Sequence, residues 1–114
     1  RGRTLGFPTA NIEPLHQDKI IPGDGVYAVT VRLENETKKN GMLNIGKNPT
    51  FAGSRRTIEV NIFDFNEDIY EDVITIEFYE KIRNETAFNS RESLIGQLER
   101  DKIHSMEILG NNND

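Results

Sequence analysis

Hydrophobic and polar residues alternate through the middle of the chain, a pattern typical of β-strands with one buried face. The first such strand places four apolar residues on one face: Tyr27, Val29, Val31 and Leu33. The same alternation predicts three further strands, over residues 38–45, 57–65 and 73–79. Short polar turns separate these runs, so we expect an antiparallel meander that closes or packs on itself.

Two interruptions modify this pattern. Asn40-Gly41 is a bulge or turn signal within the second strand, and Asn48-Pro49 is expected to end that strand. The segment Phe51–Arg56 contains Ala52-Gly53-Ser54, and we interpret it as a mobile connection.

The last third of the chain changes period. Apolar residues recur at helical spacing and predict a helix from Arg91 to Met106. Asn89 or Ser90 can cap its start, and Gly110 with the following asparagines is expected to end it. The predicted fold class is therefore mostly β with one C-terminal α-helix.

Composition narrows the classes of function. The 114 residues correspond to one domain, and the absence of cysteine excludes disulfides, thiol nucleophiles and cysteine-ligated metals. No apolar run approaches the ~20 residues of a membrane span, and no leader opens the chain, so we expect a cytoplasmic protein without a membrane partner. A net charge of −5 argues against nucleic-acid binding, but one small phosphorylated ligand needs only a local basic patch.

The loop Gly6-Phe7-Pro8-Thr9-Ala10-Asn11 is the first candidate for chemistry. Pro8 stiffens it, and side chains two apart in an extended segment, such as Thr9 and Asn11, point the same way. Their oxygens could hold Mg²⁺ and phosphate, and the flanking glycines would let backbone amides approach a phosphate. The alternative is a turn whose Thr and Asn bond to their own backbone.

Four further charged residues have both a functional and a structural interpretation. Glu59 lies on the strand face opposite the apolar residues, where it is either a general base or a solvated carboxylate. Arg83 could hold an anion or a polar ring edge, or it could form a surface ion pair with Glu80 or Glu85. Arg55-Arg56 is similarly either a phosphate clamp or a solvated charge pair.

Several motifs in order give the chain a resemblance to a known family. They are Gly2-Arg3-Thr4-Leu5-Gly6-Phe7-Pro8-Thr9-Ala10-Asn11, Gly25-Val26-Tyr27-Ala28-Val29, Asn44-Ile45-Gly46, Pro49-Thr50-Phe51, Glu59-Val60, Ile62-Phe63-Asp64-Phe65, Asp68-Ile69-Tyr70, Ile82-Arg83 and Phe88-Asn89-Ser90. Together they resemble the riboflavin kinase family, which in bacteria forms the C-terminal module of the bifunctional riboflavin kinase/FAD synthetase.

The resemblance implies a six-stranded antiparallel Greek-key barrel with a C-terminal helix. The first strand would be missing from this chain, which we interpret as a fragment with the barrel and helix at 1–109 and a polar tail at 110–114. The implied reaction transfers the γ-phosphoryl group of ATP to the 5′-hydroxyl of riboflavin and gives FMN and ADP. An adenylyltransferase domain is the implied upstream partner.

The resemblance also implies roles for individual residues. Nucleotide binding is assigned to Gly2, Arg3, Gly6, Pro8, Thr9 and Asn11. Thr9 and Asn11 would also bind Mg²⁺, Glu59 would be the catalytic base, and Arg83 and Glu85 would contact the flavin.

Two residues depart from the family pattern. Asn61 stands where the family usually has histidine, and Glu71 stands where it usually has glycine. They bear on the nucleotide side more than on the class of reaction. A non-catalytic flavin- or nucleotide-binding β-barrel is the alternative, and the presence of Thr9, Asn11 and Glu59 argues against it. An OB-like nucleic-acid module is a further alternative, disfavoured by the negative charge.

Overall fold

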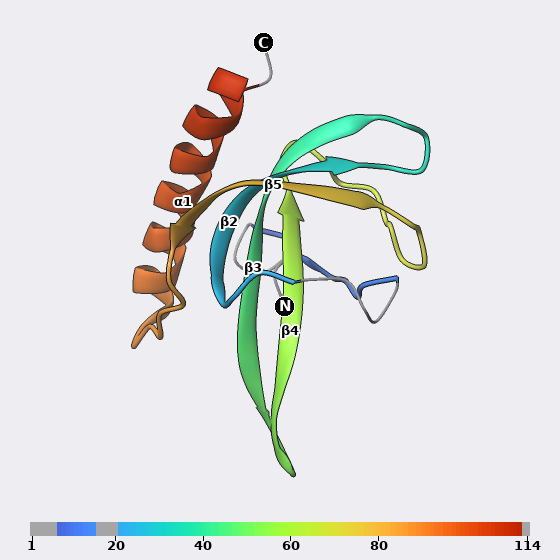
Figure 1. Cartoon of the computed structure of the whole chain (residues 1–114). Helices are drawn as coiled ribbons and strands as arrows, with labels where there is room; N and C mark the ends of the chain where they lie inside the picture. The colour runs from blue at the N-terminus through green and yellow to red at the C-terminus, as the bar shows by residue number, and fades with distance from the viewer. Residues whose placement is uncertain (1–6, 16–20, 113–114) are drawn as a thin grey trace.

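The computed structural model describes residues 7–15 and 21–112 and forms one antiparallel sheet with a C-terminal helix (Figure 1). The elements are β1 (Ala10–Asn11), β2 (Gly25–Arg32), β3 (Lys38–Thr50), β4 (Gly53–Ile62), β5 (Thr75–Arg83) and α1 (Arg91–Asn112). The mostly β class with a C-terminal helix is confirmed. The described residues form an open sheet of five strands, one fewer than in the expected six-stranded barrel, and β1 lies in a segment that was expected to be a loop.

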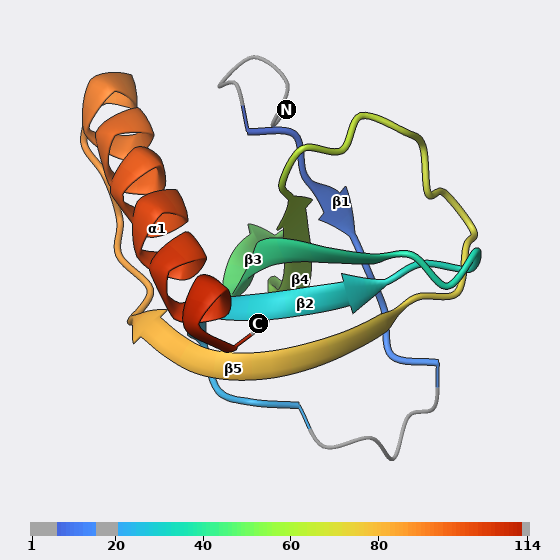
Figure 2. The same cartoon turned by 90° about the horizontal axis from the view of Figure 1, so that it is seen from above.

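The strands follow the order β1-β4-β3-β2-β5. Strands β2, β3 and β4 are consecutive hairpins, and β5 returns to lie beside β2 (Figure 2). This arrangement is a Greek key. The predicted meander is wrong for β5. A meander would pair β5 with β4, but β1 is paired with β4 on that side, and β5 is paired with β2 instead.

Strands β3 and β4 form a longer hairpin than the sequence predicts and extend beyond the rest of the sheet (Figure 1). Their pairing continues to Thr50 opposite Gly53, so the strand end at Asn48-Pro49 and the mobile connection over Phe51–Arg56 are both wrong. The pairing of β2 with β3 stops at Ile45. Beyond that point β3 is an edge strand, where a proline without an N–H is tolerated.

Asn40-Gly41 causes no turn or bulge in β3, because both residues pair in register with β2. A Cβ at Gly41 would lie 2.6 Å from the backbone oxygen of Asn61 on β4. The glycine therefore marks a close approach of two strands.

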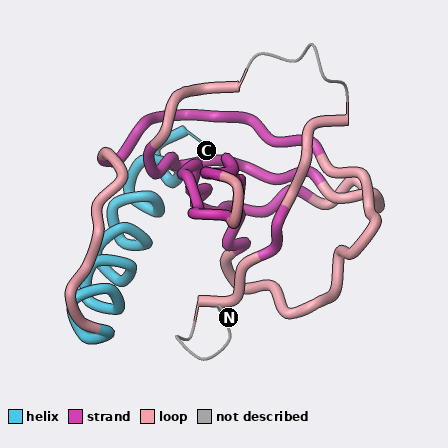
Figure 3. The backbone as a smooth tube through the Cα atoms, turned by 90° about the horizontal axis from the view of Figure 1, so that it is seen from below, coloured by secondary structure: helices cyan, strands magenta, loops and turns pink. Residues whose placement is uncertain are grey.

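The predicted strand faces are confirmed, and they build the main core. Its buried members are Tyr27, Val29, Val31, Leu33, Leu43, Ile45, Val60 and Ile62. A second cluster on the opposite face joins Val26, Met42 and Phe63 with Phe7, Ile82 and Leu98. Helix α1 packs on this side against β2, β3 and β5, so β2 is buried on both faces (Figure 3).

Helix α1 begins as predicted and ends later. Ser90 Oγ accepts the backbone N–H of Ser93 at 3.0 Å, which confirms Ser90 as the N-cap. The predicted end at Met106 is wrong: Leu109 is fully buried, and its packing extends the helix past Gly110 to Asn112. Within the described residues, no helix is long and apolar enough to span a membrane.

Candidate active site

Cross-strand pairing brings the predicted base and one predicted metal ligand together. Asn11 on β1 is paired with Glu59 on β4, and Glu59 is paired with Asn44 on β3. The same line of partners continues to Val26 on β2 and Arg83 on β5. Directly paired residues share a face with Cβ atoms roughly 4.5–5.5 Å apart, so Asn11, Glu59 and Asn44 form a polar row beside the second cluster.

Glu59 occupies a fixed position in the middle of this row. Its chain neighbours Ile58 and Val60 face the main core, so its side chain is on the other face, as predicted, and is half-buried. The flanking side chains on both sides are amides. No ion pair joins the Glu59 carboxylate to a described lysine or arginine.

Asn44 is a further candidate site residue that the sequence did not indicate. Its Oδ1 is buried and has no hydrogen-bond partner within the part of the chain that the structure describes. Buried polar atoms are nearly always satisfied, so this oxygen is a candidate acceptor for a ligand donor. In the sequence, Asn44 belongs to the Asn44-Ile45-Gly46 motif of the resemblance, but the motif alone does not indicate a role for its side chain.

Thr9 and Asn11 are both exposed at the end of the row. The alternative of a turn closed by these two side chains finds no support, since neither shows a hydrogen bond to another described residue. Pro8 is also exposed, and its carbonyl accepts a hydrogen bond from Asn61 Nδ2. The predicted nucleotide ligands Gly2, Arg3 and Gly6 lie outside the described residues.

Glu85 follows β5 and lies against Gly46 of β3. A side chain at Gly46 would collide with the Glu85 carboxylate, so glycine is required for this approach. Burial raises the pKa of Glu85 above its ordinary value, and the charges of Asp24 and Glu59 raise it further, while Arg83 lowers it. The structure therefore brings Glu85 within electrostatic reach of Glu59.

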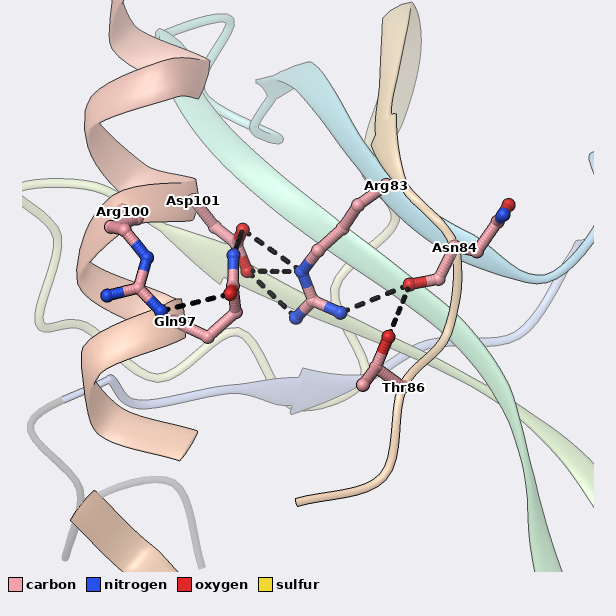
Figure 4. A network of polar contacts seen from close by, with 6 residues as sticks. All are labelled: Arg83, Asn84, Thr86, Gln97, Arg100 and Asp101. Carbon is pink, nitrogen blue, oxygen red and sulfur yellow. Dashed lines mark hydrogen bonds and ion pairs between the residues drawn. The ribbon is translucent and has the colours of Figure 1, made fainter. Parts of the chain in front are cut away.

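Arg83 is held by the C-terminal helix (Figure 4). Its Nε donates to both Asp101 oxygens at 3.0 Å, and its Nη2 lies 2.8 Å from Asp101 Oδ2. The expected ion pair with Glu80 or Glu85 is wrong. The sequence interpretation did not identify Asp101. The available signal was its position in the apolar stripe of the helix, where a charged residue indicates a buried partner.

The same guanidinium also organises the segment that follows β5. Its Nη1 donates to the carbonyl of Asn84 at 3.1 Å, and its Cζ lies 5.6 Å from the ring centre of Phe88. Gln97 donates to Asp101 at 2.9 Å from the preceding turn of α1 (Figure 4). Arg83 thus joins β5, residues 84–88 and α1.

The arginine pair near the hairpin has protein partners. Arg56 donates to Asp24 at 3.1 Å and to the Pro22 carbonyl at 2.6 Å, and Arg55 lies 3.7 Å from Glu13. These contacts favour the structural interpretation over a phosphate clamp.

The residues present fit a magnesium ion shared with phosphates. The described residues contain no group of three or more His, Asp or Glu side chains that could hold a metal by themselves. Thr9 and Asn11 offer a hydroxyl and an amide oxygen on an exposed loop. Mg²⁺ usually takes one or two protein ligands together with water and substrate phosphates, so two such donors suffice.

Comparisons with known proteins show to which family the chain is similar. The family model Flavokinase, described as riboflavin kinase, matches residues 1–109. Bifunctional riboflavin kinase/FMN adenylyltransferases from Bacillus subtilis and Haemophilus influenzae are 46% and 49% identical over 114 and 100 residues. These matches cover 97% and 88% of this chain but 35% and 32% of the relatives.

A solved structure titled as a macrolide-efflux protein from Streptococcus pneumoniae superposes with a TM-score of 0.82 and 42% identity. The match covers 91% of this chain and 34% of that one. The chain thus spans about a third of the length of the relatives it matches. On the family match over residues 1–109 and the identity to these relatives, the chain belongs to the riboflavin kinase family.

Proposed function

We propose that this chain is a riboflavin kinase domain that transfers the γ-phosphoryl group of ATP to the 5′-hydroxyl of riboflavin. The observation that carries the proposal is the pairing of Glu59 with Asn11, which sets a strand-borne carboxylate beside the loop of a riboflavin kinase motif. The complete protein would be bifunctional, with an FMN adenylyltransferase domain upstream, as in the relatives.

Glu59 acts as the general base in this proposal. Its carboxylate accepts the proton of the 5′-hydroxyl as the hydroxyl oxygen attacks the γ-phosphorus. The bond between the γ-phosphorus and the bridging oxygen breaks, and ADP leaves with the electron pair. Because Glu59 is held in a strand paired on both sides, it needs little reorganisation during the reaction.

The nucleotide side is formed by β1 and the loop before it. Thr9 and Asn11 would hold Mg²⁺ together with phosphate oxygens, and the metal would neutralise charge on the phosphates. The resemblance assigns Gly2, Arg3, Gly6 and Pro8 to nucleotide binding as well. Glycine-rich backbone in such a loop supports the assignment, since its amides can approach a phosphate closely.

The flavin side is formed by the segment after β5. Glu85 contacts the flavin in this proposal, and its carboxylate, which lies against Gly46, suits a hydrogen bond to a ring N–H. Arg83, which the resemblance also assigns to the flavin, has an ion pair with Asp101, so its main contribution is to position residues 84–88. Its remaining donors can face the flavin.

The setting of the domain follows from its substrates. Because ATP and riboflavin are small metabolites, we place the protein in the cytoplasm. With a net charge of −5, we expect neither nucleic acid nor a membrane surface as a partner.

The test is product formation in the complete protein. Riboflavin and Mg·ATP are incubated with it, and the flavins and nucleotides are separated by chromatography. The proposal requires one ADP for each FMN formed, before any FAD appears. The alternative, a non-catalytic flavin- or nucleotide-binding barrel, would bind the same ligands and leave riboflavin unphosphorylated.

A further inference from the structure

Proline 8 interrupts the pairing of β1 with β4 immediately before the predicted metal ligands. Ala10 is paired with Val60 and Asn11 with Glu59, and the Ile12 N–H donates to the Ile58 carbonyl at 2.9 Å. Antiparallel pairs alternate between bonded and non-bonded positions. Pro8 falls at the next bonded position, but it has no N–H, so the ladder cannot continue there.

The side chain of Asn61 replaces the missing backbone pairing. Its Nδ2 donates to the Pro8 carbonyl at 2.5 Å, although 53 residues separate the two in the chain. Asn61 is only 7% exposed, and its backbone is paired with Met42 in the centre of the sheet. Gly41 allows β3 to approach the Asn61 backbone closely. The donor is therefore rigidly mounted.

We propose that Asn61 is a positioning residue that fixes the Pro8–Asn11 loop relative to the base. Asn61 lies two positions after Glu59, so both side chains leave the same face of β4. Strand β4 would thereby fix the position of the Glu59 carboxylate and, through the Pro8 carbonyl, the positions of the Thr9 and Asn11 oxygens. The inference rests on the proposed function for its catalytic consequence, whereas the anchoring of the loop stands on the structure alone.

The test replaces the donor without adding a buried charge. Asn61→Leu retains similar volume but cannot donate to Pro8. Asn61→His retains an N–H that can donate to Pro8, so we expect it to behave much more like the unmodified protein than Asn61→Leu does. Asn66→Leu is the control, because Asn66 is an exposed asparagine in the connection after β4.

The first readout is hydrogen exchange of the complete protein, which requires no activity. In Asn61→Leu, the amides of β1 should exchange about five- to tenfold faster, corresponding to the loss of one hydrogen bond. Amides of β2 and β3 should keep their protection, and Asn66→Leu should change neither group. Unchanged exchange in β1, or an equal increase through the whole sheet, would overturn the proposal.

The second readout separates positioning from general damage. If the complete protein forms FMN, Asn61→Leu should raise the KM for ATP about five- to tenfold and lower kcat several-fold, because the loop is no longer held relative to Glu59, while the KM for riboflavin stays within about twofold. A parallel rise of both KM values would contradict a role confined to the nucleotide loop. Absence of FMN formation by the unmodified protein would refute the proposed function and leave the exchange result to decide the role of Asn61.

Discussion

Replacing Asp101 with asparagine should destabilise the domain strongly, because the partly buried Arg83 guanidinium would lose its fully buried counter-charge. Asp101 is 1% exposed, the Arg83 side chain is 18% exposed, and three contacts of 2.8–3.0 Å join them. Removing one partner of a buried ion pair costs about 3–5 kcal/mol. Asparagine can still accept one hydrogen bond, so we expect a loss of about 3 kcal/mol, a large part of the ~5–15 kcal/mol that stabilises a typical domain.

The assay is urea unfolding together with thermal melting. The urea midpoint should fall without a change in slope, and the melting temperature should fall by roughly 10–15 °C. The double variant Arg83→Met/Asp101→Leu should recover most of the loss, because no buried charge remains.

The control is an exposed ion pair between β4 and the segment after β1. Arg55 and Glu13 lie 3.7 Å apart, with side chains 71% and 82% exposed, so Arg55→Met should cost less than ~1 kcal/mol. The reasoning is refuted if Asp101→Asn costs no more than this control. It is also refuted if the double variant is no more stable than the single one.

Three further outcomes follow from the site. Asn11→Ala should weaken Mg·ADP binding about tenfold by calorimetry with little change in melting temperature, since the side chain is exposed; unchanged affinity would remove Asn11 from the site. Gly46→Ala should weaken riboflavin binding by displacing the Glu85 carboxylate; fluorescence titration giving unmodified affinity would contradict this. Glu85→Gln should raise the melting temperature at pH 7, because the raised pKa means that the folded state favours the protonated carboxyl. That gain should shrink as pH falls through the folded-state pKa and vanish below the ordinary value of 4.5; a lower melting temperature at pH 7 would contradict it.

The strand faces and the start of the helix could be predicted from the sequence because they depend on local pattern. Alternation alone placed Tyr27 and Val60 in the core and Glu59 on the opposite face. The Ser90 cap likewise needs only its own helix.

Features that depend on distant neighbours could not be predicted in this way. The extension of β3 through Pro49 requires knowing that β2 begins only at Gly25, opposite Ile45, so that β3 has no partner on that side beyond Ile45. The return of β5 to β2 depends on β1 covering the edge of β4. The partner of Arg83 is 18 residues away on a helix, whereas the local sequence offered Glu80 and Glu85 as nearer carboxylates.

The site was predicted in part for the same reason. The motif indicated Thr9, Asn11 and Glu59 separately, and the pairing of β1 with β4 then brought Asn11 beside Glu59. Asn44 and Asn61 could not be assigned from spacing, because their relevance comes from a buried oxygen without a partner and from a bond across 53 residues.

The most direct test of the central claim is the rate of FMN formation by Glu59→Gln in the complete protein. Glutamine retains the size of the side chain but cannot accept the proton of the riboflavin hydroxyl. Because a positioned base contributes about 10²–10⁴-fold, kcat should fall about a hundredfold or more, while riboflavin affinity and melting temperature stay close to those of the unmodified protein. Glu80→Gln, an exposed strand glutamate on β5, should remain fully active. If Glu59→Gln retains most of its turnover, Glu59 is a structural residue and the account of the active site is wrong.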